Sequence, residues 1–313
     1  MQNICQEQTK RTIVSKIVKN GKKVSTSQRR GNKPASAEEP KIHIKKQKRH
    51  INYVIFEKKD DIIMTLEENI LYLDIETVPC ESLAEDEKNE LTHIWDEKMQ
   101  KLKESDPDKY PGEENRDDYI QEAGLYAEFG QIACISFGMF YKDKSQEQQR
   151  FCVTSTYGTN EKELLTKFAA MLRSKGNTIK YICGHNAKEF DVPFIAKRMI
   201  INGIPLPEIL KIYDKKPWDM PVKDTMEMWK FGSYRGASKL KLLCAVFGIP
   251  TPKDDIDGSE VARVYYKEQN YARIAKYCEK DVVATMRVYL HILGFGTFED
   301  ERITPIPAEP CLK

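Results

Sequence analysis

The feature that most constrains this 313-residue chain is a set of carboxylates in three apolar segments that lie far apart in the sequence. The acids are Asp74 and Glu76 in the first segment, Asp191 in the second and Asp281 in the third. Carboxylates avoid buried apolar surroundings unless they are paired or bind a metal ion. A fold that brings the segments together would form an oxygen-rich site of the kind that Mg²⁺ or Mn²⁺ prefers.

The first segment, residues 70–77, is apolar and β-branched and is followed by a Val-Pro dipeptide, which predicts a core strand. Side chains alternate along a strand, so Asp74 and Glu76 share one face, where they lie about 7 Å apart. Such a pair can bind one cation or two neighbouring cations. Taken alone, it is also typical of a solvated strand face.

The second segment reads Gly-His-Asn-Ala-Lys-Glu-Phe-Asp over residues 184–191 and follows a short apolar strand at 181–183. A helical pattern then begins, with Asp191 in its first turn. The helix dipole favours an acid there, and Asn186 is equally compatible with a turn or cap, so a purely structural interpretation stays open.

The third segment belongs to a helical pattern over residues 271–290. Tyr277 and Asp281 are four positions apart, so they share one helix face and lie within reach of each other. By itself this pair is explained by a tyrosine hydroxyl that bonds to an acid on a surface helix.

The three segments together are more specific than any one of them. The order Asp-x-Glu-Thr, then Asn-x-x-x-Phe-Asp, then Tyr-x-x-x-Asp resembles the DEDD superfamily of 3′→5′ exonucleases. The tyrosine points to the DEDDy branch, which includes the proofreading domains of family A and B DNA polymerases and the RNase D-type exoribonucleases. The sister branch carries a His five positions before the last Asp, where this chain has Lys276. The stretch 253–261 is similar to stand-alone bacterial exonucleases related to the exonuclease domain of family B polymerases.

This resemblance implies a role for each acid in a site for two Mg²⁺ or Mn²⁺ ions. Asp74 would be shared by both ions, Glu76 and Asp281 would complete the position that holds the attacking water, and Asp191 would serve the second ion. Tyr277, whose unperturbed pKa is about 10, is a poor base at pH 7, so we expect it to aim the water.

The same resemblance implies three substrate-binding residues. Thr77 would contact the terminal nucleotide through its backbone or hydroxyl, and Asn186 would position the strand near the scissile phosphate. Phe190 would stack near a base or fill the core, and its apolar context favours the core.

The implied activity is that of a 3′→5′ exonuclease that acts on the 3′ ends of single-stranded DNA, releases 5′-mononucleotides and has a place in DNA repair. Two alternatives stay open: an RNase D-like exoribonuclease, and a catalytically silent nucleic-acid-binding protein. The presence of all four carboxylates and the tyrosine disfavours the silent protein. The expected fold is α/β, with a ribonuclease-H-like mixed β-sheet flanked by helices.

Composition excludes several other classes of protein. No apolar run reaches the ~18 residues of a membrane span, and the N-terminus lacks a secretion signal. The eight cysteines contain no C-x-x-C, and four of them (Cys134, Cys183, Cys244 and Cys278) lie in apolar patterns typical of core residues. We therefore expect a reducing, cytoplasmic location. The five histidines show no zinc-ligand spacing.

Charge divides the chain unevenly. Residues 1–50 contain 14 Lys or Arg and 3 Asp or Glu, whereas the rest contains 36 and 45. We expect residues 1–63 to be a basic, largely disordered tail that is either a nucleic-acid arm or a dispensable extension. The exonuclease domain would span 64–296, with a helical insertion at about 81–128, and residues 297–313 would form a C-terminal tail.

Overall fold

The computed structural model describes residues 57–58, 61–62, 68–80, 89–110, 122–145, 147–176, 178–234, 236–250 and 256–312. Nearly all of the basic tail, and part of the 253–261 stretch, therefore lie outside the described residues. Within the tail, only the short strands β1 (Glu57–Lys58) and β2 (Asp61–Ile62) are described, and they pair antiparallel with each other.

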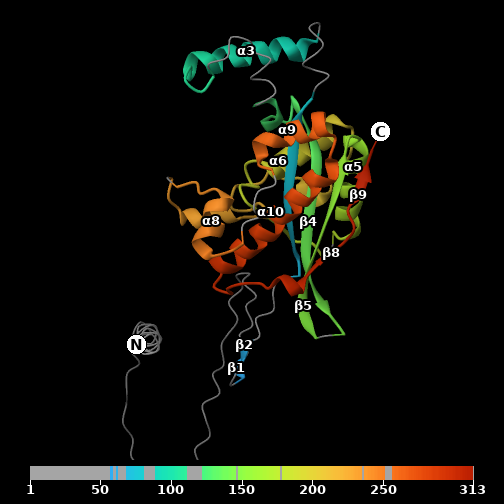
Figure 1. Cartoon of the computed structure of the whole chain (residues 1–313), viewed down its shortest axis with the longest axis vertical. Helices are drawn as coiled ribbons and strands as arrows, with labels where there is room; N and C mark the ends of the chain where they lie inside the picture. The colour runs from blue at the N-terminus through green and yellow to red at the C-terminus, as the bar shows by residue number, and fades with distance from the viewer. Residues whose placement is uncertain are drawn as a thin grey trace, which may run out of the picture. The chain divides into compact units, whose positions relative to one another are not determined.

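A seven-stranded mixed sheet forms the centre of the domain (Figure 1). Its strand order is β7-β6-β3-β4-β5-β8, and β9 also pairs with β5. The pairs β3–β4 and β4–β5 are antiparallel, whereas β3–β6, β6–β7, β5–β8 and β5–β9 are parallel. The strands are β3 (Ile70–Pro79), β4 (Gly130–Asp143), β5 (Gln148–Gly158), β6 (Tyr181–Gly184), β7 (Val222–Asp224), β8 (Ile303–Pro305) and β9 (Glu309–Cys311).

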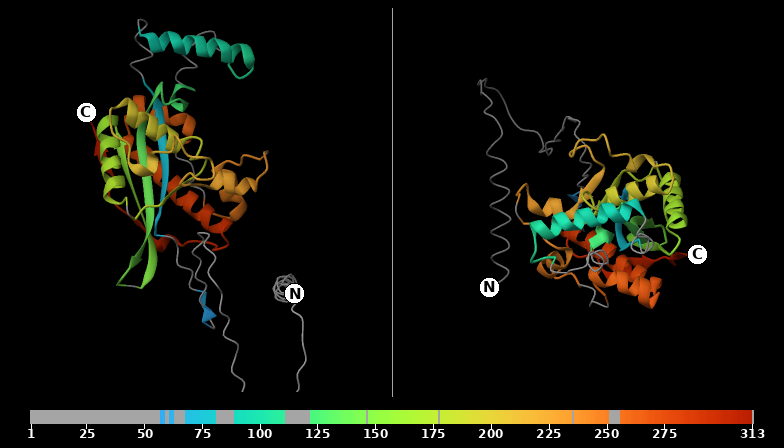
Figure 2. Two further views of the ribbon diagram at one scale, coloured as in Figure 1. Left: turned by 180° about the vertical axis from the view of Figure 1, so that it is seen from behind. Right: turned by 90° about the horizontal axis from the view of Figure 1, so that it is seen from above.

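Helices cover both faces of this sheet (Figures 1 and 2). The longer helices are α3 (Glu90–Ser105), α5 (Glu161–Ser174), α6 (Asp191–Ile201), α7 (Thr225–Lys230), α8 (Leu240–Phe247) and α10 (Tyr271–Ile292). Shorter helical turns are η1 (Ala123–Leu125), η2 (Glu208–Leu210), η3 (Gly258–Glu260), α9 (Val261–Arg263), η4 (Val264–Glu268) and η5 (Asp300–Arg302). This architecture confirms the expected α/β class, with a mixed β-sheet flanked by helices.

Side chains of β3 point alternately to the two faces of the sheet, so successive residues pack against different helices. Leu71, Leu73 and Ile75 belong to the core cluster that contains α5 and α6. Ile70 and Tyr72 point the other way, into the cluster formed with α10. Because the strand period is two, Asp74 and Glu76 share the α10 face, as the sequence predicts.

A buried ion pair joins the two helices of the opposite face. Arg198 of α6 donates from Nε and Nη2 to the Glu161 carboxylate at 2.9 and 2.6 Å, and from Nη1 to the Ala127 carbonyl at 2.9 Å. The Glu161 carboxylate also accepts from the Ile132 backbone N–H at 2.8 Å and from the Asn202 amide at 2.9 Å. This cluster connects α5, α6 and β4, and we call it the Glu161–Arg198 clamp.

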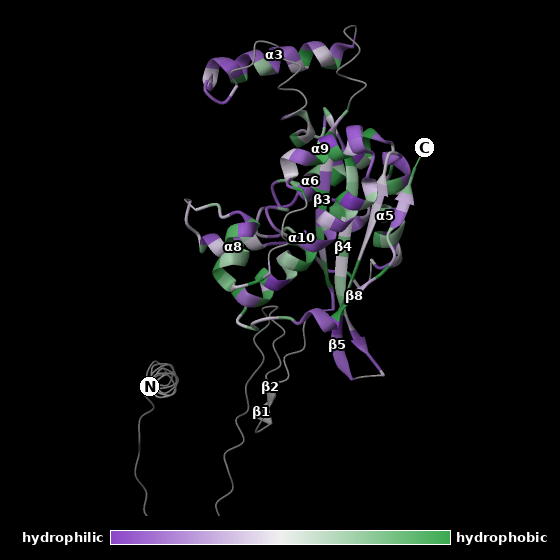
Figure 3. Ribbon diagram, in the orientation of Figure 1, coloured by the Kyte–Doolittle hydropathy of each residue, from purple (hydrophilic) through white to green (hydrophobic). Residues whose placement is uncertain are grey.

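Several element boundaries differ from what the local sequence pattern alone predicts. Alternating side chains over residues 132–141 and 149–154 predict a hairpin; in the structure both strands are longer, and the tip is hydrophilic (Figure 3). The pattern over 222–226 predicts a strand, which ends at Asp224 because that side chain accepts from the N–H groups of Met226 and Glu227 and so caps α7. Gly248, in the left-handed region at φ 67°, ends α8.

Two regions add structure beyond the predicted elements. In the segment predicted as a helical insertion, α3 buries Trp95 and Met99 in a small cluster with Phe129. The segment 297–313, separated above as a C-terminal tail, contributes β8 and β9 to the sheet. Gly158 makes the β9 contact possible, since a Cβ there would lie 2.3 Å from the Cys311 carbonyl oxygen.

Candidate active site

The candidate site lies where β3 extends beyond its partner β6. The parallel pairing with β6 covers only Ile70, Leu71 and Tyr72. Beyond Tyr72 the backbone of β3 is open on that side, while the antiparallel pairing with β4 continues on the other. The chain leaves β3 toward β4 on one side and returns as β6 on the other, which is the kind of switch point where α/β sheets bind ligands.

Asp191 fills this open side of β3. As the first residue of α6, it accepts a hydrogen bond from the Ile75 backbone N–H through Oδ1 at 3.1 Å. Its carboxylate is 4% exposed, and Ile75 is the residue between Asp74 and Glu76. The structure therefore brings the second segment directly against the first.

The turn between β6 and α6 requires unusual backbone geometry. A Cβ on Gly184 would lie 2.3 Å from the Ala187 Cβ, so the tight turn out of β6 needs glycine. Asn186 has φ 67°, a left-handed conformation that asparagine tolerates, and its N–H donates to Asp224 Oδ1 at 3.0 Å. The Lys188 N–H donates to the other Asp224 oxygen at 3.0 Å. Asp224 thus holds the loop that positions Asp191.

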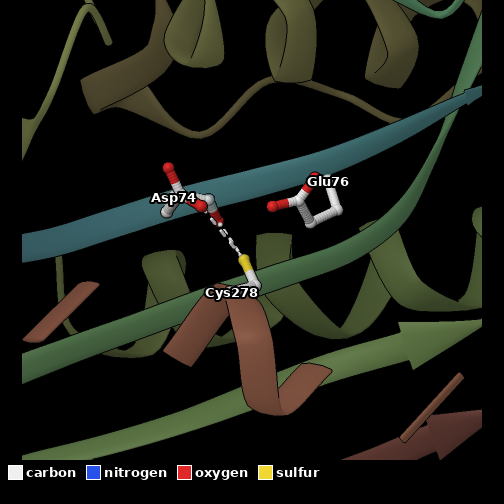
Figure 4. A group of neighbouring side chains, drawn as sticks. All are labelled: Asp74, Glu76 and Cys278. Carbon is white, nitrogen blue, oxygen red and sulfur yellow. Dashed lines mark hydrogen bonds between the residues drawn. The ribbon is translucent and has the colours of Figure 1, made fainter. Parts of the chain in front are cut away.

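Helix α10 supplies the third side of the site. The thiol of Cys278 points from α10 toward β3 (Figure 4) and lies 3.3 Å from both Oδ2 and the backbone oxygen of Asp74. One ligand atom each from Asp74, Glu76 and Cys278 lie within 4.8 Å of one another. Sequence reasoning placed Cys278 only in the core; it is buried, but it also meets the acids. Because Cys278 directly follows Tyr277 on the predicted helix, the sequence could have indicated that its thiol lies near the acids.

The four carboxylates interact strongly with one another. Burial, then the neighbouring Asp191, Asp281 and Glu76 carboxylates, raises the pKa of Asp74 well above its usual range. Burial and Asp281 raise the pKa of Glu76 in the same way. Burial raises the pKa of Asp191 to about 7, although the Ile75 hydrogen bond opposes this. Ionising all four neighbouring carboxyl groups is unfavourable unless a bound cation offsets their repulsion.

Tyr277 lies beside this group. Its hydroxyl is in hydrogen-bonding contact with the Asp281 carboxylate. Burial, followed by the charges of Asp281, Glu76 and Asp74, raises the pKa of Tyr277 far above its ordinary value. The phenol therefore stays protonated and can donate a hydrogen bond, which is consistent with aiming a water and not with acting as a base.

The structure also places the three residues expected to bind substrate. A bulge follows Glu76 in β3, and the Thr77 hydroxyl beyond it donates to the Gly124 carbonyl at 2.7 Å. Phe190 packs on the core, with its ring 5.4 Å from that of Phe194, as its apolar context favours. Asn186 is half-buried in the loop before α6. Contact of these residues with a nucleotide stays a prediction.

The donor set fits a hard divalent cation. Carboxylate oxygens from three different elements converge, and their mutual repulsion would be relieved by positive charge. The thiol of Cys278 has its pKa raised by burial, so it remains a neutral donor to Asp74 and does not add charge. Asp74, Glu76, Asp191 and Asp281 are the residues that would hold Mg²⁺ or Mn²⁺.

Comparison with protein families decides the class of protein. The model of a family described as "Predicted 3'-5' exonuclease related to the exonuclease domain of PolB" matches residues 125–304. This chain belongs to that family. The matched span includes Asp191, Tyr277 and Asp281 but begins after Asp74 and Glu76, which the fold brings to the same place.

This exonuclease-family protein is also similar to one curated protein in sequence and to one solved structure in fold. It is 25% identical over 147 residues to an uncharacterized protein of Methanocaldococcus jannaschii, covering 45% of this chain and 79% of the relative. Its structure is similar to that of the family B DNA polymerase from Pyrobaculum calidifontis, with a TM-score of 0.46 and 12% identity, covering 72% of this chain. The exonuclease-family chain matches 24% of the polymerase's length.

The exonuclease family implies a nucleic acid as substrate and is consistent with divalent-metal use. Among the helices that the structure describes, none is both long and apolar enough to cross a bilayer.

Proposed function

We propose that this chain is a metal-dependent 3′→5′ exonuclease that removes 5′-mononucleotides from the 3′ ends of single-stranded DNA. The observation that carries the proposal is the convergence of Asp191, Tyr277 and Asp281, all inside the family match, with Asp74 and Glu76 from outside it. An ordinary cluster of surface acids needs no special positioning. Here three separate elements, the loop before α6 with its left-handed Asn186, and the buried hydrogen bond from the Ile75 N–H to Asp191 all position the acids.

The residues of the chain have distinct roles in this mechanism. Asp74, Glu76, Asp191 and Asp281 would hold two divalent ions, which when bound lower the pKa of a water and stabilise charge on the leaving 3′-oxygen. In the absence of ions, the single O–H of the protonated Tyr277 donates to the Asp281 carboxylate, which fixes the phenol on the side of the site that α10 supplies. With Asp281 bound to an ion, this O–H would instead donate to the attacking water and orient it. The Ile75 N–H holds Asp191 in register with the two acids of β3.

The test uses 5′-labelled single strands of DNA and RNA of matched sequence, with Mg²⁺, with Mn²⁺ or with EDTA. We expect a ladder that shortens from the 3′ end of DNA, no products in EDTA, and none from Asp74→Asn. Asp108→Asn is the matched control, because Asp108 is an exposed acid in the turn after α3.

Each other result changes the proposal in a definite way. Nucleotide release by Asp74→Asn, or by the native protein in EDTA, would contradict metal-dependent chemistry at this site. Cleavage of RNA with little cleavage of DNA would assign the RNase D-like activity instead. Equal internal cutting of a 3′-blocked strand would make the protein an endonuclease.

A further inference from the structure

The exposed aromatic side chains of this protein are concentrated in one segment. Among the described residues, every Phe, Tyr or Trp that is exposed lies between positions 213 and 234. They are Tyr213, Trp218, Phe231 and Tyr234, which are 80%, 76%, 82% and 105% exposed. Buried aromatics elsewhere stabilise the core, but these rings contribute little to it.

The same segment is basic on an otherwise acidic domain. Residues 211–241 contain eight Lys or Arg and four Asp or Glu, whereas residues 51–313 as a whole carry an excess of acids. One of the four acids, Asp224, is buried as a helix cap. The ammonium of Lys216 lies 5.5 Å from the centre of the Trp218 ring, so charge and ring are presented together. We call residues 211–241 the aromatic–basic segment.

The end of α7 presents one of these rings to solvent. Phe231 is the left-handed C-cap of this helix, at φ 46°, and its side chain is 82% exposed. Its neighbour Trp229 packs into the protein, 5.3 Å from Phe247, which stacks on His291 of α10 at 5.0 Å. The C-cap explains the backbone of Phe231 but not its large exposed ring, because a small or polar residue would end the helix without exposing apolar surface.

Three contacts hold the segment next to the carboxylates. His185, in the loop before Asp191, donates from Nε2 to the Ser238 carbonyl at 2.8 Å. Lys188 of the same loop forms an ion pair with Glu227 of α7 at 2.8 Å. On the other side, the segment runs into the first turn of α8, which packs on α10, the helix of Tyr277 and Asp281.

Figure 1 shows the loop before α8 projecting away from the sheet, on the side where α8 packs along α10. Exposed rings interleaved with lysines suit a flexible, unpaired strand, because every base has a face that can stack and every nucleotide has a phosphate. A stable protein interface would instead need a depletion of charge at its centre.

We propose that the aromatic–basic segment is a stacking platform for single-stranded nucleic acid, binding the nucleotides that precede the 3′ end held at the carboxylates. The inference deepens the exonuclease function proposed above and rests on it for the polarity of the strand. Bases stack on rings such as Trp218 and Phe231, while Lys216 and its basic neighbours contact phosphates.

The test measures binding without turnover, by anisotropy of 5′-fluorescein-labelled dT20 and U20 with the full chain in EDTA. We expect Trp218→Ala and Phe231→Ala each to raise Kd about 5- to 150-fold, the loss of one base stacked on an aromatic ring. Trp218→Phe keeps a ring, so its Kd should stay within about threefold of the native value. Ile200→Ala, at an apolar side chain 62% exposed on α6, is the control and should leave Kd unchanged.

Two readouts separate stacking from a loss of structure. Strand addition should quench the tryptophan fluorescence of the native protein and of Phe231→Ala but quench Trp218→Phe less. Trp95, which is 2% exposed, and the half-buried Trp229 remain as background in every variant. Lys216→Ala should reduce the slope of log K against log salt by about 0.7, as expected for one phosphate contact on a single strand.

The outcomes distinguish this inference from the exonuclease proposal. If the alanine variants bind dT20 and U20 as tightly as the native protein, the platform is overturned, and the exposed rings are then assigned to a protein contact. If the variants lose affinity as expected but the native protein releases no nucleotide, the platform stands and the exonuclease function fails.

Discussion

Breaking the Glu161–Arg198 clamp should strongly destabilise the fold. Arg198→Met removes two charge-assisted hydrogen bonds to Glu161 and one to the Ala127 carbonyl, all within 3 Å. Both partners are 7% exposed, so water cannot replace the lost guanidinium. Breaking a buried pair from one side costs about 3–5 kcal/mol.

The magnitude follows from what remains around Glu161. In Arg198→Met the carboxylate keeps only the Ile132 N–H and the Asn202 amide. Glu161→Gln in the same background removes the unpaired charge while the amide oxygen still accepts from Ile132. The double variant should therefore be more stable than Arg198→Met alone, with a coupling energy of about 1–3 kcal/mol.

The assays are urea denaturation for the free energy of unfolding and thermal denaturation for Tm, both followed by circular dichroism in EDTA so that metal binding does not contribute. Arg198→Met should lower Tm by roughly 6–20 °C, since each kcal/mol shifts a domain of this size by about 2–4 °C. Lys197→Met, next to it on α6, breaks an exposed ion pair with Glu128 and should cost less than about 1 kcal/mol. Equal destabilisation by Arg198→Met and Lys197→Met would refute the reasoning.

Three further predictions address the catalytic helix, the basic tail and the sheet. Asp281→Ala should remove nearly all activity, whereas Tyr277→Phe should lose about 10- to 10³-fold in kcat with little change in KM. If steady-state kinetics of Tyr277→Phe show an unchanged kcat, Tyr277 does not belong to the site. A truncated protein that begins at Met64 should fold and keep a similar kcat. If the tail contacts nucleic acid, the truncated protein should also bind with a flatter salt dependence. A truncated protein that folds but is inactive at saturating substrate would place the tail in the catalytic domain. Gly158→Ala, at φ 138° and against Cys311, should cost about 1–3 kcal/mol in urea, whereas Gly176→Ala should have little effect, and equal costs would contradict the close approach of β9.

Much of the fold follows from local patterns in the sequence. The period-two alternation in β3 predicts that Asp74 and Glu76 share a face, and the 3.6-residue period of α10 puts Tyr277 beside Asp281. These patterns are strong because each element buries one face. The family resemblance then supplied what no local pattern contains, namely that the three segments meet.

Other features depend on tertiary contacts that leave little trace in the sequence. The apolar sequence around Cys278 predicts only a core residue, and its contact with Asp74 becomes visible only when α10 packs on β3. The strands β8 and β9 have three residues each and contain prolines, so their pattern was too short to identify. Asp224 reads in the sequence only as an acid at the end of a short strand, and its two roles, as the cap of α7 and as the anchor of the loop before α6, become visible only in the fold.

The pairing of β8 and β9 with β5 has a consequence for how the protein is made. At the other edge, β7 has three residues, whereas β5 has eleven and would offer a long row of free backbone groups. An uncovered edge of that length is a template for pairing with a second molecule. The residues that shield it follow every other strand that the structure describes, so during ribosomal synthesis β5 stays open until they emerge. Aggregation of nascent or truncated chains should therefore begin at β5, and chaperone binding at this edge would protect it during that interval.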